Sequence, residues 1–203
     1  EHISKEIYDN AYIIAVKNSI NFLDEIGITP DFCVSNFEGS AKKINIDILK
    51  KYKTVNIAST YDVSPKLPEL KKYFNYIVKL FPPKKKNLME LVINDMKDLD
   101  FKNINNEIYT GWGHIMMELA LPLCIFLETK NIITIGWDNN PKIIKHWDNI
   151  ENFDNITNDT NWASSDVICN KFSPYLHDYL WKHYKIRIYK INKNSTMKIP
   201  LFK

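Results

Sequence analysis

The stretch that decides the fold is residues 110–140, which read TGWGHIMMELALPLCIFLETKNIITIGWDNN. It combines a glycine-containing turn, a long apolar segment with helical spacing and a short β-branched run. Because glycine has no Cβ, backbone amides near Gly111 and Gly113 can approach a ligand closely, and the N-terminus of the following helix favours an anion. The spacing predicts a helix over residues 113–127 that Pro122 kinks or splits.

The β-branched run that follows predicts a central parallel strand over residues 132–136, covered on both faces. Ligands of open α/β sheets bind outside the carboxyl ends of such strands, so Asp138 is a candidate binding residue. The same Gly-Trp-Asp sequence is also compatible with a tight turn and an Asx cap. Trp112 and Trp137 flank this region, where each could stack on a ligand or belong to the core.

Strand-like and helical segments alternate along the rest of the chain, which is typical of an α/β fold with a mostly parallel sheet flanked by helices. The predicted strands cover residues 11–16, 32–35, 54–59, 76–80, 132–136 and 187–191. The predicted helices cover residues 18–26, 46–52, 87–97, 113–127 and 173–183, with a weaker one over 66–73. The irregular segment 139–166 follows the strand end directly and is predicted to be a lid-like loop.

Composition narrows the class of protein. With 203 residues and 45% hydrophobic residues, the chain is predicted to form a single domain over residues 1–203. No apolar run approaches the roughly 20 residues that span a bilayer, so no membrane span is expected. The net charge is only +3 and Arg187 is the one arginine, which argues against nucleic acid as a partner.

The three cysteines, Cys33, Cys124 and Cys169, lie in apolar surroundings far apart in the sequence. They are interpreted as buried reduced thiols, which favours a cytoplasmic location. No Cys/His cluster has zinc spacing, so no metal site is predicted. A phosphate-binding GxxxxGK loop and a GxGxxG fingerprint are both missing from the sequence, which removes the main support for the common P-loop and dinucleotide-binding classes.

Residues 12–39 read YIIAVKNSINFLDEIGITPDFCVSNFEG, a strand, a helix, the motif GITPDF and a second strand that ends at Asn36. This layout resembles the domain of the flagellar motility accessory factors and of the bacterial lipooligosaccharide sialyltransferases. The tail LHDYLWKHYKIRIYKINKNS, residues 176–195, is similar to their final helix, strand and turn. The resemblance implies a Rossmann-like fold of the GT-A type.

The resemblance also implies a site for a nucleotide-sugar donor, as in the sialyltransferases that use CMP-sialic acid. No cofactor is implied beyond that donor, and the acceptor would be a glycan or protein hydroxyl. An asparagine amide can both donate to and accept from a base or ribose. The nucleotide-binding residues implied are Asn18, Asn36, Thr110, Gly111, Trp112, Gly113 and Asp138.

Two departures from these relatives are visible. The relatives begin with a strand and a GxGPSL-type turn that contacts the nucleotide, and this sequence starts just after that point. Their catalytic histidine is missing from the matching residues 162–166, so His146 and then Asp166 are the candidate catalytic bases. Asp98 and Asp100 match a metal-binding DxD pattern, which would allow a divalent metal, but a solvated helix end explains them better.

The sequence therefore predicts a nucleotide-sugar-dependent glycosyltransferase. A homo-oligomeric state is compatible with this prediction. A second enzymatic alternative comes from a distant branch of the same domain family, the archaeal pterin pyrophosphokinases, which transfer diphosphate from ATP. The third alternative is a non-catalytic binding or assembly module with the same fold.

Overall fold

The computed structural model describes residues 5–36, 45–52, 54–60, 72–79, 116–137 and 173–203. The chain divides into two compact units, Glu1–Lys84 with Phe101–Leu123 and Lys85–Asp100 with Cys124–Lys203. That residues 1–203 act as a single domain stays a prediction. The predicted lid, residues 139–166, and the predicted helix at 87–97 lie outside the described residues.

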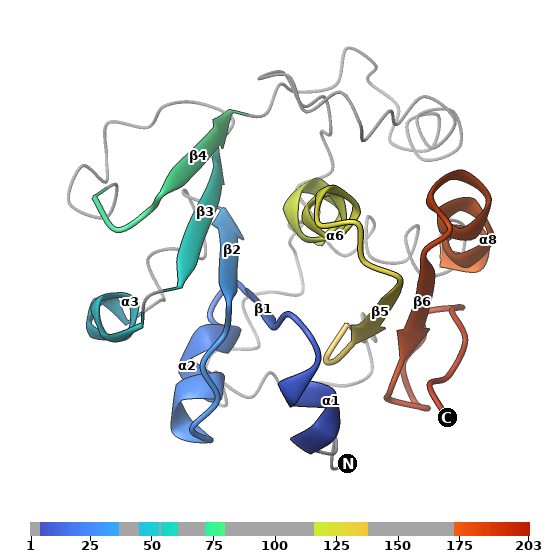
Figure 1. The fold of residues 1–203 in the computed structure, drawn as a ribbon, viewed down its shortest axis with the longest axis horizontal. Coiled ribbons are helices and arrows are strands. Elements are labelled where there is room, and N and C mark those ends of the chain that lie inside the picture. The colour runs from blue at the N-terminus through green and yellow to red at the C-terminus, as the bar shows by residue number, and fades with distance from the viewer. Residues whose placement is uncertain (1–4, 37–44, 53, 61–71, 80–115, 138–172) are drawn as a thin grey trace, which may run out of the picture. The chain divides into compact units, whose positions relative to one another are not determined.

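The first unit is built on a four-stranded parallel sheet in the order β1-β2-β3-β4, with all arrows pointing the same way (Figure 1). Parallel neighbours require crossovers, which α2 supplies between β1 and β2 and α3 between β2 and β3. The predicted α/β class with a parallel sheet and flanking helices is confirmed. The elements are α1 (Lys5–Asp9), β1 (Ile14–Val16), α2 (Ser19–Glu25), β2 (Phe32–Asn36), α3 (Ile46–Lys51), β3 (Val55–Thr60) and β4 (Tyr76–Lys79).

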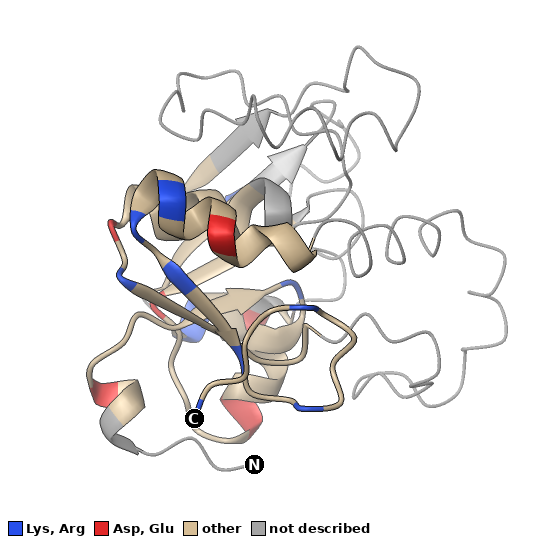
Figure 2. Cartoon of the chain, turned by 90° about the vertical axis from the view of Figure 1, so that its right-hand side faces the viewer, with Lys and Arg blue, Asp and Glu red and all other residues tan. Residues whose placement is uncertain are grey.

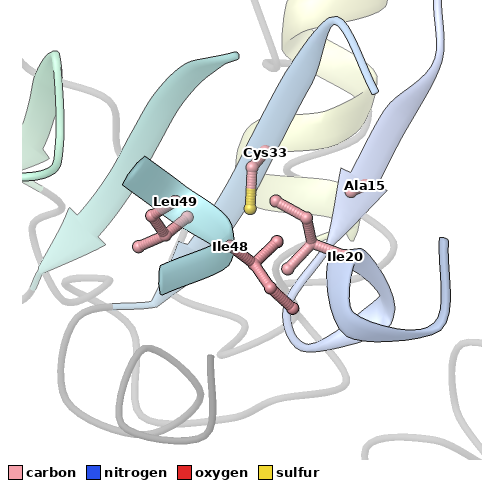
Figure 3. Close-up of a cluster of buried hydrophobic side chains, with 5 residues drawn as sticks. All are labelled: Ala15, Ile20, Cys33, Ile48 and Leu49. Atoms are coloured by element: carbon pink, nitrogen blue, oxygen red, sulfur yellow. The ribbon is translucent and has the colours of Figure 1, made fainter. Parts of the chain in front are cut away.

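Alternate residues along the strands point to opposite faces of the sheet, and each face has its own hydrophobic core. Ala15 of β1 and Cys33 of β2 face the same side, where they pack with Ile20 of α2 and with Ile48 and Leu49 of α3 (Figure 3). The side chain of Cys33 points toward those of Ile20 and Ile48, and both Ile20 and Cys33 are fully buried. Burying a side chain of this size stabilises the fold by roughly 1.5–3 kcal/mol.

The opposite face of the same sheet is covered by the helical segment that begins at Met116. Val34 of β2 packs there with Leu119 and Ala120, and Ile14 and Ile57 contact this cluster. The segment is split as Pro122 predicts: a wide π-helical turn, η2 (Met116–Ala120), precedes a regular helix, α6 (Leu121–Phe126). Proline has no N–H to donate, so the wider turn before it avoids a regular helical bond at that position.

Gly27 ends α2 with a Schellman motif. It has a φ of 73°, the N–H of Gly27 donates to the Asp24 carbonyl at 3.1 Å, and the N–H of Ile28 donates to the Leu23 carbonyl at 2.8 Å. These bonds satisfy carbonyls that a helix end otherwise leaves open. The motif redirects the chain into residues 27–32, which read GITPDF and enter β2.

The second unit contains a parallel pair, β5 (Asn131–Thr134) and β6 (Arg187–Lys190), and the helix α8 (Ser173–Tyr184). Helix α8 packs against β6, and Leu180 and Ile188 are fully buried. The prediction of a strand over residues 132–136 covered on both faces is wrong at its end. Gly136, with a φ of 71°, turns the chain after Thr134, and Ile135 is 65% exposed.

Candidate functional site

The carboxyl ends of β1 and β2 bring two predicted site residues to the same edge of the sheet. Val16 of β1 pairs with Val34 of β2. Asn18 follows Val16 by two residues, and Asn36 follows Val34 by two residues. Asn36 is the last residue of β2 and Asn18 is the N-cap of α2, so both residues lie at the carboxyl edge of the sheet, where open α/β sheets bind their ligands.

The turn that carries Asn18 is held in place by backbone bonds. The Lys17 N–H donates to the Val34 carbonyl at 2.7 Å, and Lys17 has a φ of 58°, a left-handed conformation that costs a non-glycine residue about 1 kcal/mol or more. The Ser19 hydroxyl accepts a hydrogen bond from the Val16 N–H at 2.8 Å. Asn18 is half-buried at the start of α2, and its side chain makes no capping hydrogen bond to that helix.

Ser35 is a polar residue at this edge that the sequence does not single out. It lies one residue before Asn36 and is fully buried, on the same face as Cys33. Its hydroxyl has no hydrogen-bond partner among the described residues. A buried hydroxyl without a hydrogen-bond partner lowers the stability of a fold by about 1–3 kcal/mol. Such a group is usually explained by a functional role or by a bound water molecule.

The GITPDF motif, in contrast, has a structural role. The Asp31 carboxylate accepts a hydrogen bond from the Ile13 N–H at 2.8 Å, and the Asp31 N–H donates to the Ile13 carbonyl at 2.9 Å. The buried Thr54 hydroxyl donates to the Pro30 carbonyl at 2.9 Å. The motif thus fixes the amino ends of β1, β2 and β3, at the edge opposite Asn18 and Asn36.

Most of the other predicted site residues lie outside the described residues, and of Asn36 only the backbone is described. Trp137 is described: it is 7% exposed, and its carbonyl accepts a hydrogen bond from the Ser195 hydroxyl at 3.0 Å. Of the two alternatives for this tryptophan, the structure supports the core position. The undescribed residues are Thr110, Gly111, Trp112, Gly113, Asp138, His146 and Asp166, together with Asp98 and Asp100.

Two of the three cysteines are described, and both are buried with free thiols, as predicted. Burial raises the pKa of the Cys33 thiol to about 12, and burial is also the main cause that raises the pKa of Cys124 to about 12. The thiolate is the nucleophilic form of cysteine. Neither side chain is therefore a candidate nucleophile.

A hollow of about 380 Å³ opens at the amino edge of the sheet, where β3 and β4 begin. Thr54, Asn56, Tyr73 and Asn75 contribute polar groups to its lining. The Asn56 side-chain N–H donates to the Tyr73 carbonyl at 3.0 Å, while its buried carbonyl oxygen is unpaired among the described residues. None of the predicted site residues lines this hollow, so the sequence gives it no assigned role.

Within the described ranges, no three His, Cys, Asp or Glu residues lie close enough together to hold a metal ion. In the same ranges, no helix is both long and apolar enough to cross a bilayer.

The parallel sheet, its crossover helices and the asparagine-bearing strand ends define a Rossmann-like α/β protein. A family model described as 6-hydroxymethylpterin diphosphokinase MptE-like matches residues 1–143, and the chain belongs to this MptE-like family. The family is Rossmann-like and related to glycosyltransferases, and membership indicates a transferase-like function. No curated protein and no solved structure matches the chain.

Proposed function

We propose that this protein is a nucleotide-dependent transferase that binds its nucleotide at the carboxyl ends of β1 and β2. The observation that carries the proposal is the parallel pairing of β1 and β2, which brings Asn18 and Asn36, each two residues along the chain from the Val16–Val34 pair, to the carboxyl edge of the sheet. The turn at Lys17, fixed by its bond to the Val34 carbonyl, and the Ser35 hydroxyl, which has no partner within the described part of the chain, lie at the same edge. Membership in a transferase-like family supports the same conclusion.

Group transfer from a nucleotide makes three chemical demands. The base and ribose need hydrogen-bond partners, the leaving phosphate needs its charge balanced, and the acceptor hydroxyl must lose a proton. We assign hydrogen bonding to the base and ribose to Asn18 and Asn36. Thr110, Gly111, Trp112, Gly113 and Asp138 are the other predicted nucleotide-binding residues, and His146 or Asp166 is the predicted base.

Two reactions fit this site, and they differ in the nucleotide used. The sequence motifs around Asn18 and Asn36 favour transfer of a sialic-acid-like sugar from a CMP-linked donor to a glycan or protein hydroxyl. The family description favours transfer of diphosphate from ATP to the hydroxymethyl group of a pterin. The second reaction requires Mg²⁺ to balance the charge of the triphosphate, whereas the first carries a single phosphate on the leaving group.

Thermal unfolding in the presence of CMP, UDP, GDP and ATP, each with and without Mg²⁺, tests the proposal. A ligand that binds only the folded state raises its stability by about 2.7 kcal/mol at a concentration of 100 times its Kd. We expect CMP to stabilise without metal if the donor is a CMP-sugar, and ATP to stabilise only with Mg²⁺ if the reaction is diphosphate transfer. Stabilisation by none of the four nucleotides would overturn the proposal.

Asn18→Ala and Asn45→Ala form a matched pair of variants for the same assay. Asn18→Ala removes the proposed hydrogen bonds to the nucleotide and is expected to weaken its binding by about tenfold, which is about 1.4 kcal/mol. Asn45 caps α3, where its side chain accepts from the Asp47 N–H at 3.0 Å. Asn45→Ala should lower stability by about 1 kcal/mol and leave nucleotide binding unchanged.

Turnover distinguishes an enzyme from a non-catalytic binding module of the same fold. The stabilising nucleotide is supplied as the corresponding donor, a CMP-sugar or ATP with Mg²⁺, and release of free CMP or AMP is followed. Nucleotide binding without such release, in the presence of a hydroxyl acceptor, would favour the binding module over both transferases.

A further inference from the structure

The described part of the second unit is strongly basic. It contains eight lysine or arginine residues against two acidic residues, Glu128 and Asp178, and seven of the eight basic residues lie between residues 182 and 203. Blue segments accordingly outnumber red ones on α8, on β6 and on the chain that follows (Figure 2). The basic residues are Lys130, Lys182, Lys185, Arg187, Lys190, Lys193, Lys198 and Lys203.

Five exposed residues of α8 and the start of β6 combine this charge with aromatic rings, and we name them the basic face. Residues 175, 178, 181 and 182 recur at helical spacing on α8, Lys185 directly follows the helix with a φ of 59°, and all of them are exposed. Tyr175 is 66% exposed and Trp181 is 42% exposed. The basic face comprises Tyr175, Trp181, Lys182, Lys185 and Arg187.

Two of the cations lie over the indole ring of Trp181. The Lys185 ammonium lies 5.5 Å from the centre of the indole ring, and the Arg187 guanidinium lies 4.7 Å from it. Contacts of this kind are worth about 0.5–1 kcal/mol at an exposed site. They restrict two long side chains before any partner binds, so less conformational entropy is lost on association.

Salt bridges within the described residues do not neutralise these cations. Lys185 and Arg187 make none there, in contrast to Lys50 and Lys51 of the first unit, which pair with Asp47 and Asp24. The guanidinium of Arg187 presents a planar fork of donors that matches a carboxylate in a bidentate geometry. The face therefore offers pre-positioned donors for negatively charged groups.

The composition of the face favours a protein over other polyanions. Binding of single-stranded nucleic acid uses open aromatic rings on which bases stack, and the Trp181 ring already carries two cations. Insertion of the Trp181 ring into a membrane surface would carry the Lys185 and Arg187 charges with it, which is unfavourable. Tryptophan, tyrosine and arginine are the residues most enriched at the centres of protein interfaces.

We infer that the basic face of α8 and β6 binds an acidic segment of a partner protein, with Trp181 and Arg187 at its centre. Carboxylates of the partner pair with Arg187, Lys185 and Lys182, while Tyr175 and Trp181 contact apolar side chains between those carboxylates. This surface belongs to the second unit alone, and its occupancy does not require the proposed nucleotide site.

Fluorescence anisotropy with a labelled random copolymer of glutamate and tyrosine tests the inference on the full chain. We expect saturable binding that weakens as salt is added, because the interaction depends on charge. The triple variant Lys182→Gln, Lys185→Gln, Arg187→Gln should bind about tenfold more weakly. The control variant Lys72→Gln, Lys193→Gln, Lys203→Gln removes the same number of charges from exposed positions outside the face and should bind within about twofold of the parent chain.

Trp181→Leu separates the role of the ring from that of net charge. It retains every cation but releases Lys185 and Arg187, so copolymer binding should fall by about threefold. Equal losses in the triple and control variants, or no loss in Trp181→Leu, would overturn the inference. So would tighter binding of oligothymidylate or of phosphatidylserine vesicles that depends on the same residues, because the partner would then be a nucleic acid or a membrane.

Discussion

Removing the hydroxyl of Ser35 should stabilise the free protein, although most substitutions in a core destabilise it. Ser35 is fully buried and its hydroxyl is unpaired among the described residues, so the fold bears a desolvation cost of about 1–3 kcal/mol there. Ser35→Ala removes that cost and leaves only a small void. We expect a net gain of about 1 kcal/mol, which corresponds to a rise in Tm of roughly 2–4 °C for a chain of this size.

Thr54→Val is the matched control in the same unit. It also deletes one buried hydroxyl, but the Thr54 hydroxyl donates to the Pro30 carbonyl at 2.9 Å. Valine keeps the shape of the side chain and leaves that carbonyl unpaired, so stability should fall by about 1–2 kcal/mol. The two changes are therefore expected to have opposite signs.

Equilibrium unfolding in urea measures both variants, with the midpoint and the slope recorded separately. A change of midpoint at constant slope reports stability itself. If Ser35→Ala lowered the stability as much as Thr54→Val, the Ser35 hydroxyl would have a partner in the folded protein. The interpretation of this residue as an unsatisfied group at the carboxyl edge would then be refuted.

Four further outcomes are expected. Ile20→Ala, at a fully buried position between α2 and the sheet, should cost about 2–5 kcal/mol in urea unfolding, and a loss below 1 kcal/mol would contradict the packing in Figure 3. Gly27→Ala should lower the free energy of unfolding by about 1–2 kcal/mol, because a φ of 73° is unfavourable for a residue with a Cβ. A steric clash does not contribute, since no atom lies within 4 Å of the added Cβ. An unchanged stability would refute the Schellman motif. The raised pKa of Cys33, about 12 against an ordinary 9.0, means that its contribution to stability is present below pH 9 and is lost as the pH rises toward 12. Cys33→Ala should therefore flatten the stability profile in that range, whereas an unchanged profile would contradict the burial of the thiol. Hydrogen bonds from Lys51 and then Tyr52 lower the pKa of Asp24, so the stability lost in Asp24→Asn should be largest above the ordinary pKa of 3.8 and disappear at more acidic pH. A loss that is independent of pH would show that the carboxylate charge is not the cause.

The fold could largely be predicted from the sequence because local patterns decide its elements. β-Branched runs with short connections predicted all the strands of the described residues to within a few positions, and helical spacing predicted α2, α3 and α8. Pro122 predicted the split of the helix that follows residue 115, since it lacks an N–H. The motif GITPDF predicted the crossover from α2 to β2.

Features that depend on tertiary contacts could not be predicted in this way. The burial of Ser35 depends on tertiary packing around the end of β2, which no local pattern records. The β-branched pattern extends the predicted strand to Gly136, whereas β5 ends at Thr134 and Gly136 adopts a positive φ in the turn that follows. The sequence leaves two alternatives for Trp137. A tryptophan beside a strand end can belong to a hydrophobic core or contact a ligand, and no local pattern distinguishes the two.

The sequence names the residues of the candidate site, and their role in binding stays a prediction. The position of Asn18 and Asn36 at the carboxyl edge follows from the order of strand, helix and strand, because consecutive parallel strands have their carboxyl ends at the same edge of the sheet. The conformation of Lys17 and its bond to Val34 became visible only in three dimensions. His146, Asp166 and the turn at Gly111 lie outside the described residues, so their roles stay predictions.

The most direct test of nucleotide binding at the carboxyl edge is a titration of isotopically labelled protein, with backbone amide resonances followed by NMR. CMP is added in one series and ATP with Mg²⁺ in another. The account predicts that the amides of Lys17, Asn18 and Asn36 shift with one of the nucleotides, while those of Asn56 and Asn75 at the amino edge stay in place. Shifts confined to Asn56 and Asn75, or no shift with either nucleotide, would contradict it.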